Sequence, residues 1–422
     1  MTNLKMNKSG AMFGKFALAV CASLIFGISA VVAQEGNSPA ATIVVFNTND
    51  SGAGSLRAAI LQANASAGVP DTINFTVAAN SIISPTSPLP TITDTVSTMG
   101  APVEINGATA GATAYGLRIS APSCLIQNIA VTGFQEGGIR INSTGNFTNL
   151  QVSQIGVNAL GVVKPNVNRG IVVVGATGVL ITGNTISGNT GNGIEITAGG
   201  SATIRNNRIG TSSDGLTDVG NTSHGILIAL SSSSTIGGTT AGDRNIISGN
   251  NGSGILIAAD VDFPASNNIV AGNFIGVNAN GTAALPNNGS GVVVQGANNT
   301  IGNTLTGGRN VISGNAVNGI TISTSLATGN VVRGNLIGVG SNGTTSVANV
   351  ANGIQISTAA FNNTIGGTSV TAGQCDGDCN VIANNGSVAS FSATAGVYLD
   401  ISAGAGNQIR ANRIFGNYRC RH

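Results

Sequence analysis

The chain has 422 residues, of which 62 are glycine, 8% are charged, 4% are aromatic and none is tryptophan. This composition is unusual for a globule and fits a chain that makes many tight turns around a thin apolar core. The formal net charge of +2 includes Lys5, Lys8 and Lys15 of an N-terminal leader, and without them 14 basic residues face 15 acidic ones, a net charge of −1. This balance gives no basic surface suited to nucleic acid, so we expect no nucleic-acid partner.

Residues 1–33 are predicted to be a secretory signal peptide. Three lysines precede an apolar stretch over residues 16–32, and small residues before Ala33 place the cleavage site between Ala33 and Gln34. The alternative is an uncleaved membrane anchor, because the apolar run is close to the roughly 18 residues that a span needs. We favour cleavage because the polar pair Gln34-Glu35 follows. This predicts a secreted, extracellular or cell-surface protein without a membrane span.

Residues 34–100 are predicted to form an N-terminal cap followed by irregular first coils. A strand starts near Thr42, and Ser55 is a good N-cap for a helix whose apolar face comprises Leu56, Ala59, Ile60 and Ala63. Residues 71–75 then form the strand that enters the coils. An amphipathic helix at this place covers the open apolar end of a repeat protein.

Residues 101–417 contain internal repeats. Arg244-Asn-Ile-Ile-Ser-Gly-Asn250 returns as Arg309-Asn-Val-Ile-Ser-Gly-Asn315, and such self-similarity indicates a solenoid. A Gly-aliphatic-x-aliphatic motif also recurs, and each copy alternates as a short strand with two residues inward and one outward. Its shortest spacing of 22 or 23 residues allows one full turn and a parallel pairing with the previous strand. The predicted fold is an all-β parallel β-helix. The motif begins at Gly116, Gly138, Gly170, Gly193, Gly225, Gly254, Gly291, Gly319, Gly353 and Gly396.

Asn-x-Ile-x-Gly-Asn followed by Gly-Ile-x-Ile resembles the right-handed parallel β-helix repeat of the pectin-lyase-like superfamily, over roughly residues 100–417. Residues 54–59 are partly similar to the Cys-Ser-Leu-Arg-Glu-Ala (CSLREA) element of secreted β-helix proteins, with Gly54 and Ala58 in place of its Cys and Glu. The resemblance implies a right-handed coil. It also implies that any catalytic carboxylates, calcium ligands and basic residues stand on outward positions of consecutive coils.

The outward position of the repeated motif is its third residue, and this column holds a single acid, Glu195. Glycoside hydrolysis needs two carboxylates, and a calcium-assisted lyase needs an acidic cluster. We therefore predict no catalytic site, and the least unlikely catalytic residues are Glu195, Arg140 and His224. The column reads Arg118, Arg140, Val172, Glu195, Leu227, Leu256, Val293, Thr321, Gln355 and Tyr398.

Leu227, Leu256 and Val293 form an aliphatic run in this outward column. We favour the interpretation that long loops such as residues 276–287 fold over them. The alternative is a surface that contacts a partner or a polymer, because contiguous exposed apolar patches are uncommon on monomers.

Cys375-Asp-Gly-Asp-Cys379 is predicted to close a small disulfide loop, as expected for an exported protein. Asp376 and Asp378 also permit a weak Ca²⁺ site, although oxygen ligation needs about six donors. Asp260 and Asp262 are the other weak metal candidates. We predict no further cofactor.

Residues 418–422 interrupt the repeat where a further Gly-Ile-x-Ile is expected, which we interpret as truncation of a longer protein. The function predicted from the sequence is a structural or interaction role, adhesin-like or glycan-contacting, without catalysis. Its partner is an extracellular polysaccharide or a cell-surface molecule. The alternatives are a polysaccharide lyase or glycoside hydrolase, and a periplasmic carbohydrate- or metal-binding module.

Overall fold

The computed structural model describes residues 40–418 except 264, 368–370, 372–373 and 387–393. Met1–Asn37 is one unit of the chain and Ser38–His422 is the other. The predicted signal peptide, its cleavage site at Ala33 and Gln34, and residues 419–422 of the C-terminal tail lie outside the described residues. No described helix is long and apolar enough to cross a membrane.

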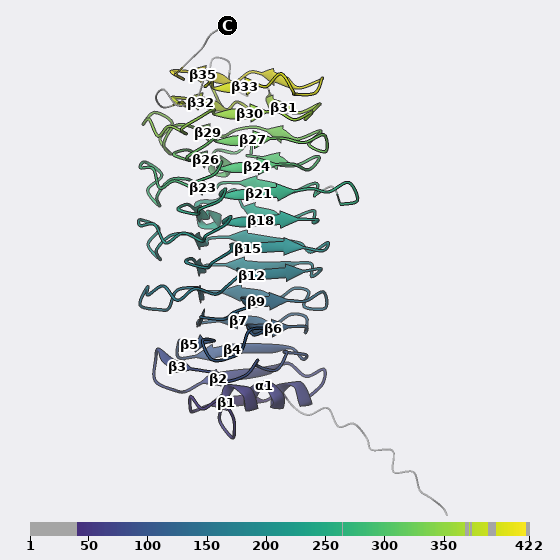
Figure 1. The fold of residues 1–422 in the computed structure, drawn as a ribbon, viewed down its shortest axis with the longest axis vertical. Coiled ribbons are helices and arrows are strands. Elements are labelled where there is room, and N and C mark those ends of the chain that lie inside the picture. The colour runs from purple at the N-terminus through teal and green to yellow at the C-terminus, as the bar shows by residue number, and fades with distance from the viewer. Residues whose placement is uncertain (1–39, 264, 368–370, 372–373, 387–393, 419–422) are drawn as a thin grey trace, which may run out of the picture. The chain divides into compact units, whose positions relative to one another are not determined.

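Three parallel sheets form the walls of the coils, and successive strands of each sheet come from successive coils (Figure 1). The chain passes from sheet A to sheet B to sheet C in each regular coil. This arrangement confirms the predicted right-handed parallel β-helix. Sheet A comprises β1 (Thr42–Val45), β2 (Asp71–Phe75), β4 (Val96–Gly100), β7 (Leu125–Gln127), β10 (Asn149–Gln151), β13 (Val179–Thr182), β16 (Ala202–Arg205), β19 (Thr235–Gly237), β22 (Ile269–Ala271), β25 (Thr300–Ile301), β28 (Val331–Val332), β31 (Thr364–Gly366) and β34 (Gln408–Arg410).

Sheet C begins later in the chain than the other two, so the first coils have walls from sheets A and B only. Two short 3₁₀ helices, η1 (Ala241–Asp243) and η2 (Thr306–Gly308), lie in turns between sheets A and B. Sheet B comprises β3 (Ser81–Ile83), β5 (Val103–Asn106), β8 (Ile129–Thr132), β11 (Gln154–Ile155), β14 (Thr185–Ile186), β17 (Arg208–Ile209), β20 (Ile246–Ile247), β23 (Phe274–Ile275), β26 (Val311–Ile312), β29 (Leu336–Ile337), β32 (Val381–Ala383) and β35 (Arg413–Phe415). Sheet C comprises β6 (Tyr115–Ile119), β9 (Gly137–Ile141), β12 (Arg169–Val174), β15 (Asn192–Thr197), β18 (Ile226–Ala229), β21 (Ile255–Ala258), β24 (Val292–Val294), β27 (Ile320–Ile322), β30 (Ile354–Ile356) and β33 (Val397–Leu399).

Helix α1 (Leu56–Ala65) caps the N-terminal end of the coils as expected. Ser55 accepts a hydrogen bond from the Ala58 amide, and the four predicted apolar residues of the helix are buried against β1 and β2. The Arg57 guanidinium forms an ion pair with Asp50 at 2.7 Å and donates to the carbonyl oxygens of Ser87 and Pro88. These contacts tie the helix to the first coil, so Asp50 and Arg57 are structural.

Ladders of buried asparagines run along the inside of three corners of the coils. Except at the last asparagine of each ladder, the Nδ2 of each asparagine donates to the Oδ1 of the asparagine in the next coil, over 2.8–3.1 Å, and most also donate to a backbone carbonyl. The ladders satisfy backbone groups that the turns leave unpaired. The ladder before sheet C comprises Asn166, Asn189, Asn221, Asn250, Asn287, Asn315, Asn349, Asn385 and Asn417. The ladder before sheet B comprises Asn184, Asn207, Asn245, Asn273, Asn310, Asn335, Asn380 and Asn412, and the ladder before sheet A comprises Asn268, Asn299, Asn330, Asn363 and Asn407.

Four hairpin loops follow alternate strands of sheet B, namely residues 157–163, 211–218, 277–284 and 339–346. The last three loops are joined in succession, since the Ala279 amide donates to Gly215 O and the Ser341 amide donates to Gly281 O. Beneath them lies a second apolar cluster, on the outside of the coils, in which residues of the hairpin loops pack on the outward-facing side chains of the sheet B strands. The long loops therefore cover sheet B, and not the aliphatic run of sheet C that we expected them to cover. The cluster comprises Ile246, Phe274, Val277, Val311, Leu336, Val339, Val347, Val381 and Ala383.

The last described strands, β34 and β35, have exposed side chains, among them Ile409 and Ile414. In the preceding coil, Cys375 and Cys379 form a disulfide. The Arg309 guanidinium donates to the carbonyl oxygens of both cysteines and of Gly334. This arginine thereby fixes the disulfide loop to the neighbouring coils.

Candidate functional site

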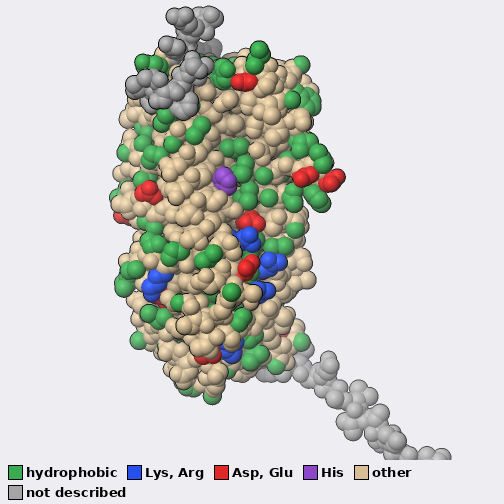
Figure 2. All heavy atoms as spheres, in the orientation of Figure 1, with side chains coloured by type: hydrophobic (Ala, Val, Ile, Leu, Met, Phe, Trp, Pro, Cys, Tyr) green, Lys and Arg blue, Asp and Glu red, His purple; other side chains and the backbone are tan. Residues whose placement is uncertain are grey.

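The outward face of sheet C carries the column of residues that the sequence motif singles out. Strand pairing puts the ten members in one register from Arg118 in β6 to Tyr398 in β33. At about 4.8 Å per coil, the column spans nine steps, or about 43 Å. Figure 2 shows this face, with charged side chains gathered over β6–β15 and hydrophobic side chains nearer the middle of the sheet. The face is thus one continuous surface, and the polarity of its side chains changes along the column.

Arginines surround the ring of Tyr115 at the N-terminal end of this face. The Cζ atoms of Arg118 and Arg140 lie 4.9 and 5.8 Å from the ring centroid, within the range of cation–π attraction. Arg169 from β12 approaches the same tyrosine, with its Nη1 3.4 Å from the hydroxyl. Three guanidinium groups from three consecutive coils therefore meet at one aromatic side chain. We call these four residues the arginine–tyrosine cluster.

Two carboxylates border the arginine–tyrosine cluster. Glu195 Oε2 lies 3.2 Å from Arg169 Nε as an ion pair outside hydrogen-bond geometry, and it accepts a hydrogen bond from Asn192 at 3.3 Å. On the other side, the Tyr115 hydroxyl donates to Glu136 Oε1 at 3.4 Å. A chain of contacts therefore runs from Glu136 through Tyr115 and Arg169 to Glu195. The column holds Glu195 as its single acid, and the structure adds Glu136, from the loop before β9, at the other end of this contact chain.

The catalytic candidates Glu195, Arg140 and His224 lie on the same face, but their side chains form hydrogen bonds with other residues and not with one another. Arg140 donates to Asn142 Oδ1 at 2.7 Å and is separated from Glu195 by Val172 in the column. His224, the purple side chain in Figure 2, accepts a hydrogen bond at Nδ1 from the Ser253 amide at 3.0 Å. Burial lowers the pKa of His224, which favours the neutral imidazole. Asn192 links His224 to Glu195, because its side chain accepts a hydrogen bond from the His224 backbone amide and donates one to Glu195.

Beyond Glu195 the column turns apolar and then polar. Leu227, Leu256 and Val293 pair in register, and each is half-buried in the sheet with its side chain outward. The next members, Thr321 and Gln355, are joined by the Asn318 side chain, which donates to Thr321 Oγ1 at 3.0 Å and Gln355 Oε1 at 2.8 Å. The face thus passes from cationic and aromatic groups through an aliphatic strip to amides and hydroxyls.

The predicted metal candidates do not assemble into a metal centre. Asp260 and Asp262 lie in an exposed loop after β21, and among the described residues no three His, Cys, Asp or Glu side chains are grouped as metal ligands. Asp378 lies 3.5 Å from Arg333, and Asp376 accepts a hydrogen bond from the Thr371 amide. Calcium binding at either pair stays a prediction.

Residues 103–288 match a family model described as "Right handed beta helix region". This match agrees with the three parallel sheets of the structure. The chain has the right-handed parallel β-helix fold. Among curated proteins, no sequence matches that of this β-helix protein.

Several solved structures resemble the β-helix protein at low sequence identity. The periplasmic alginate epimerase AlgG is 14% identical over 81% of this chain and 76% of its own, with a TM-score of 0.46. The A-module of the Azotobacter vinelandii mannuronan C-5 epimerase AlgE6 is 12% identical over 87% and 95%, with a TM-score of 0.40. The Dettilon tailspike protein gp208 is 15% identical over 85% and 66%, with a TM-score of 0.35. At these sequence identities and TM-scores, the likeness gives no information about the activity of the β-helix protein.

Sequence reasoning located the column of the β-helix protein but missed Tyr115, Glu136 and Arg169. Tyr115 and Arg169 lie one residue before the motif glycines Gly116 and Gly170, and Glu136 lies two residues before Gly138. The pattern that predicts them is a polar or aromatic residue just before the glycine in three successive copies of the sheet C motif.

Proposed function

We propose that this protein is a secreted or cell-surface β-helix that contacts an extracellular acidic polysaccharide along the outward face of sheet C and does not cleave it. The observation that carries this proposal is the arginine–tyrosine cluster at one end of an in-register face. The N-terminal leader in the sequence supports export.

The chemistry of the face fits a chain of acidic sugars. Guanidinium groups bind carboxylates with two parallel hydrogen bonds. Tyr115 is buried and holds Arg118 and Arg140 by cation–π contacts, so the arginines are the groups that meet the polymer. The aliphatic strip of Leu227, Leu256 and Val293 continues the surface without charge. A polymer can therefore be held at the cationic end and supported along the sheet, which favours the contact-surface interpretation of these three residues.

We expect the double variant Arg118→Gln/Arg140→Gln to bind polygalacturonate or alginate at least tenfold more weakly than the unmodified protein. Two charges that face the polymer are lost, and the remaining attraction is weakened further by salt. Isothermal titration calorimetry at low and moderate ionic strength measures the change.

The matched control is Arg205→Gln/Arg410→Gln, which removes the same charge from exposed positions on sheet A. Equal weakening by both double variants shows that the net charge alone matters and contradicts a specific surface on sheet C. Failure of the unmodified protein to bind either acidic polymer contradicts the proposal as a whole.

A polysaccharide lyase or hydrolase is the second candidate, and the contact chain from Glu136 to Glu195 favours it. Glycoside hydrolysis needs two carboxyl groups that flank the scissile bond, and arginines beside a tyrosine suit an elimination at a uronate. This candidate predicts that the mature protein releases reducing or unsaturated ends from an acidic polysaccharide. It also predicts that Glu136→Gln and Glu195→Gln each lower that rate at least a hundredfold. Intact polymer after prolonged incubation, measured by size-exclusion chromatography, excludes this candidate and agrees with the non-cleaving role.

A further inference from the structure

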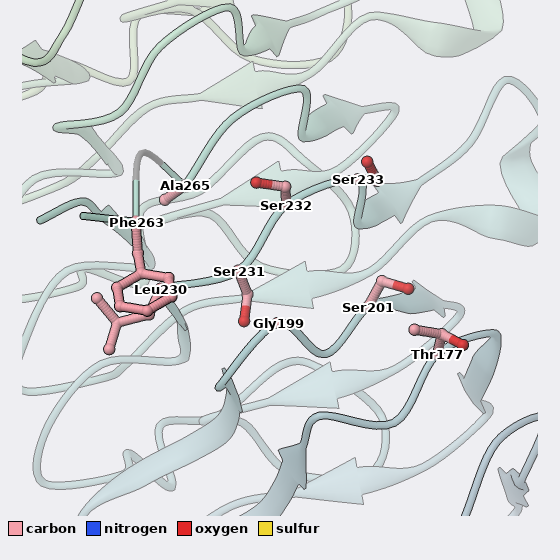
Figure 3. A pocket seen from close by; sticks show the side chains of 9 residues that line it. All are labelled: Thr177, Gly199, Ser201, Leu230, Ser231, Ser232, Ser233, Phe263 and Ala265. Atoms are coloured by element: carbon pink, nitrogen blue, oxygen red, sulfur yellow. The ribbon is translucent and has the colours of Figure 1, made fainter. Parts of the chain in front are cut away.

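A pocket of about 330 Å³ lies at the corner where the chain leaves sheet C and enters sheet A. Turns of four consecutive coils contribute to it, those after β12, β15, β18 and β21. Figure 3 shows Phe263 and Leu230 together at one end and the hydroxyl side chains of Ser201 and Thr177 at the other. Its volume lies at the lower end of the range of about 300–1,000 Å³ that small-molecule sites occupy.

The Ser231 hydroxyl is the group in this pocket that points to a ligand. Ser231 is only 2% exposed, and its Oγ has no hydrogen-bond partner among the residues that the structure describes. A buried hydroxyl without a partner is unfavourable, so such groups are rare unless water or a ligand satisfies them. The neighbouring Ser232 differs, since its Oγ accepts a hydrogen bond from the Ser266 amide at 2.9 Å.

The pocket combines hydroxyls with an exposed aromatic ring, and none of the described residues that line it has an ionisable side chain. Phe263 is 52% exposed, although it stands at the mouth of a pocket, and this leaves its ring available for stacking. A neutral sugar ring offers C–H groups to an aromatic face and hydroxyls to serine and threonine. An anionic sugar finds no positive charge here to offset its desolvation. We therefore propose that this corner pocket binds a neutral saccharide unit, with Ser231 as a hydrogen-bonding residue and Phe263 as the stacking platform.

The experiment measures binding of cellotetraose, maltotetraose and mannotetraose by isothermal titration calorimetry, beside the acidic tetragalacturonate. We expect at least one of the neutral tetrasaccharides to bind the unmodified protein, and we expect Ser231→Ala and Phe263→Ala each to weaken that binding about tenfold. Ser231→Ala should unfold at the same temperature as the unmodified protein or higher, because the hydroxyl that it removes has no protein partner. A loss of binding at unchanged stability separates a ligand contact from a structural role.

Phe46→Ala is the matched control, because Phe46 is 61% exposed and lies in the N-terminal cap, away from the pocket. The control should bind the neutral tetrasaccharide as the unmodified protein does, and so should Arg118→Gln/Arg140→Gln, so the result does not depend on the function proposed for sheet C. If none of the three neutral tetrasaccharides binds, or if Ser231→Ala and Phe263→Ala bind as tightly as the unmodified protein, water alone satisfies Ser231 and the proposal is wrong.

Discussion

Asn287→Ala should lower the free energy of unfolding by about 3–5 kcal/mol, because it interrupts the asparagine ladder before sheet C. Asn287 is fully buried and donates to Ile247 O at 2.9 Å and to Asn315 Oδ1 at 3.0 Å. Its own Oδ1 accepts from both the backbone amide and the side-chain amide of Asn250. Alanine leaves these buried groups without a partner, and each orphaned group costs about 1–3 kcal/mol.

Asn288→Ala is the control for this prediction, since the neighbouring asparagine is exposed and its side chain donates to the exposed Asn251 Oδ1 at 3.1 Å. Its effect should stay within about 0.5 kcal/mol. Urea unfolding followed by circular dichroism measures both variants, and the transition midpoints are compared as well because long repeat arrays can lose two-state behaviour. Equal midpoints for the two variants contradict a stabilising role for the ladder.

The fold could be predicted from the sequence because its period is local. Each Gly-aliphatic-x-aliphatic motif encodes one strand of sheet C, and the repeats between residues 225 and 356 encode the coils that join these strands. The cap followed from Ser55 and the four apolar helix residues. The order in which the coils stack then follows from the chain order alone, since each coil pairs mainly with the coils before and after it.

The positions of the hairpin loops and of the ladders also have a signal in the sequence, which is the spacing between successive asparagines. Asn245 and Asn250 are five positions apart in a coil without a hairpin loop, whereas Asn273 and Asn287 are fourteen apart in a coil with one. The two asparagines flank a sheet B strand in both coils. A spacing that alternates in this way predicts loops on every second coil, and these loops then need an apolar surface beneath them.

The arginine–tyrosine cluster could be predicted only in part, because its contacts depend on turn conformation. Arg118 and Arg140 occupy motif positions, so their alignment follows from the repeat. Glu136 lies in a turn, and its approach to Tyr115 depends on dihedral angles that the motif does not specify. The disulfide loop is similar in this respect, since Arg309 reaches the carbonyl oxygens of Cys375 and Cys379 from two coils away. Sites that are built from the turns of several coils therefore cannot be predicted from local sequence patterns.

The asparagine ladder also explains why the sheet C motif begins with glycine in the coils that contain the ladder. From residue 170 to residue 353, each motif glycine follows a ladder asparagine by four positions, as in Asn250 and Gly254. A methyl group on Gly254 would lie 2.7 Å from the carbonyl oxygen of Gly291 and 3.0 Å from Asn287 Nδ2 of the next coil. Carbon atoms do not approach a backbone oxygen this closely without displacement, so the ladder and the next strand leave room for hydrogen only.

Gly254→Ala should therefore lower the free energy of unfolding by about 2–3 kcal/mol, the cost of overpacking a tight interior. Gly242→Ala is the control, because the nearest atom to its added methyl is Thr240 Oγ1 at 3.7 Å in an open 3₁₀ turn. This control should be neutral or slightly stabilising. Urea unfolding measures both variants, and a Gly254→Ala protein as stable as Gly242→Ala would show that the coils can separate to admit a methyl group. Because Gly254 and Asn287 touch across the same corner, Gly254→Ala/Asn287→Ala should lose less stability than the sum of the single variants.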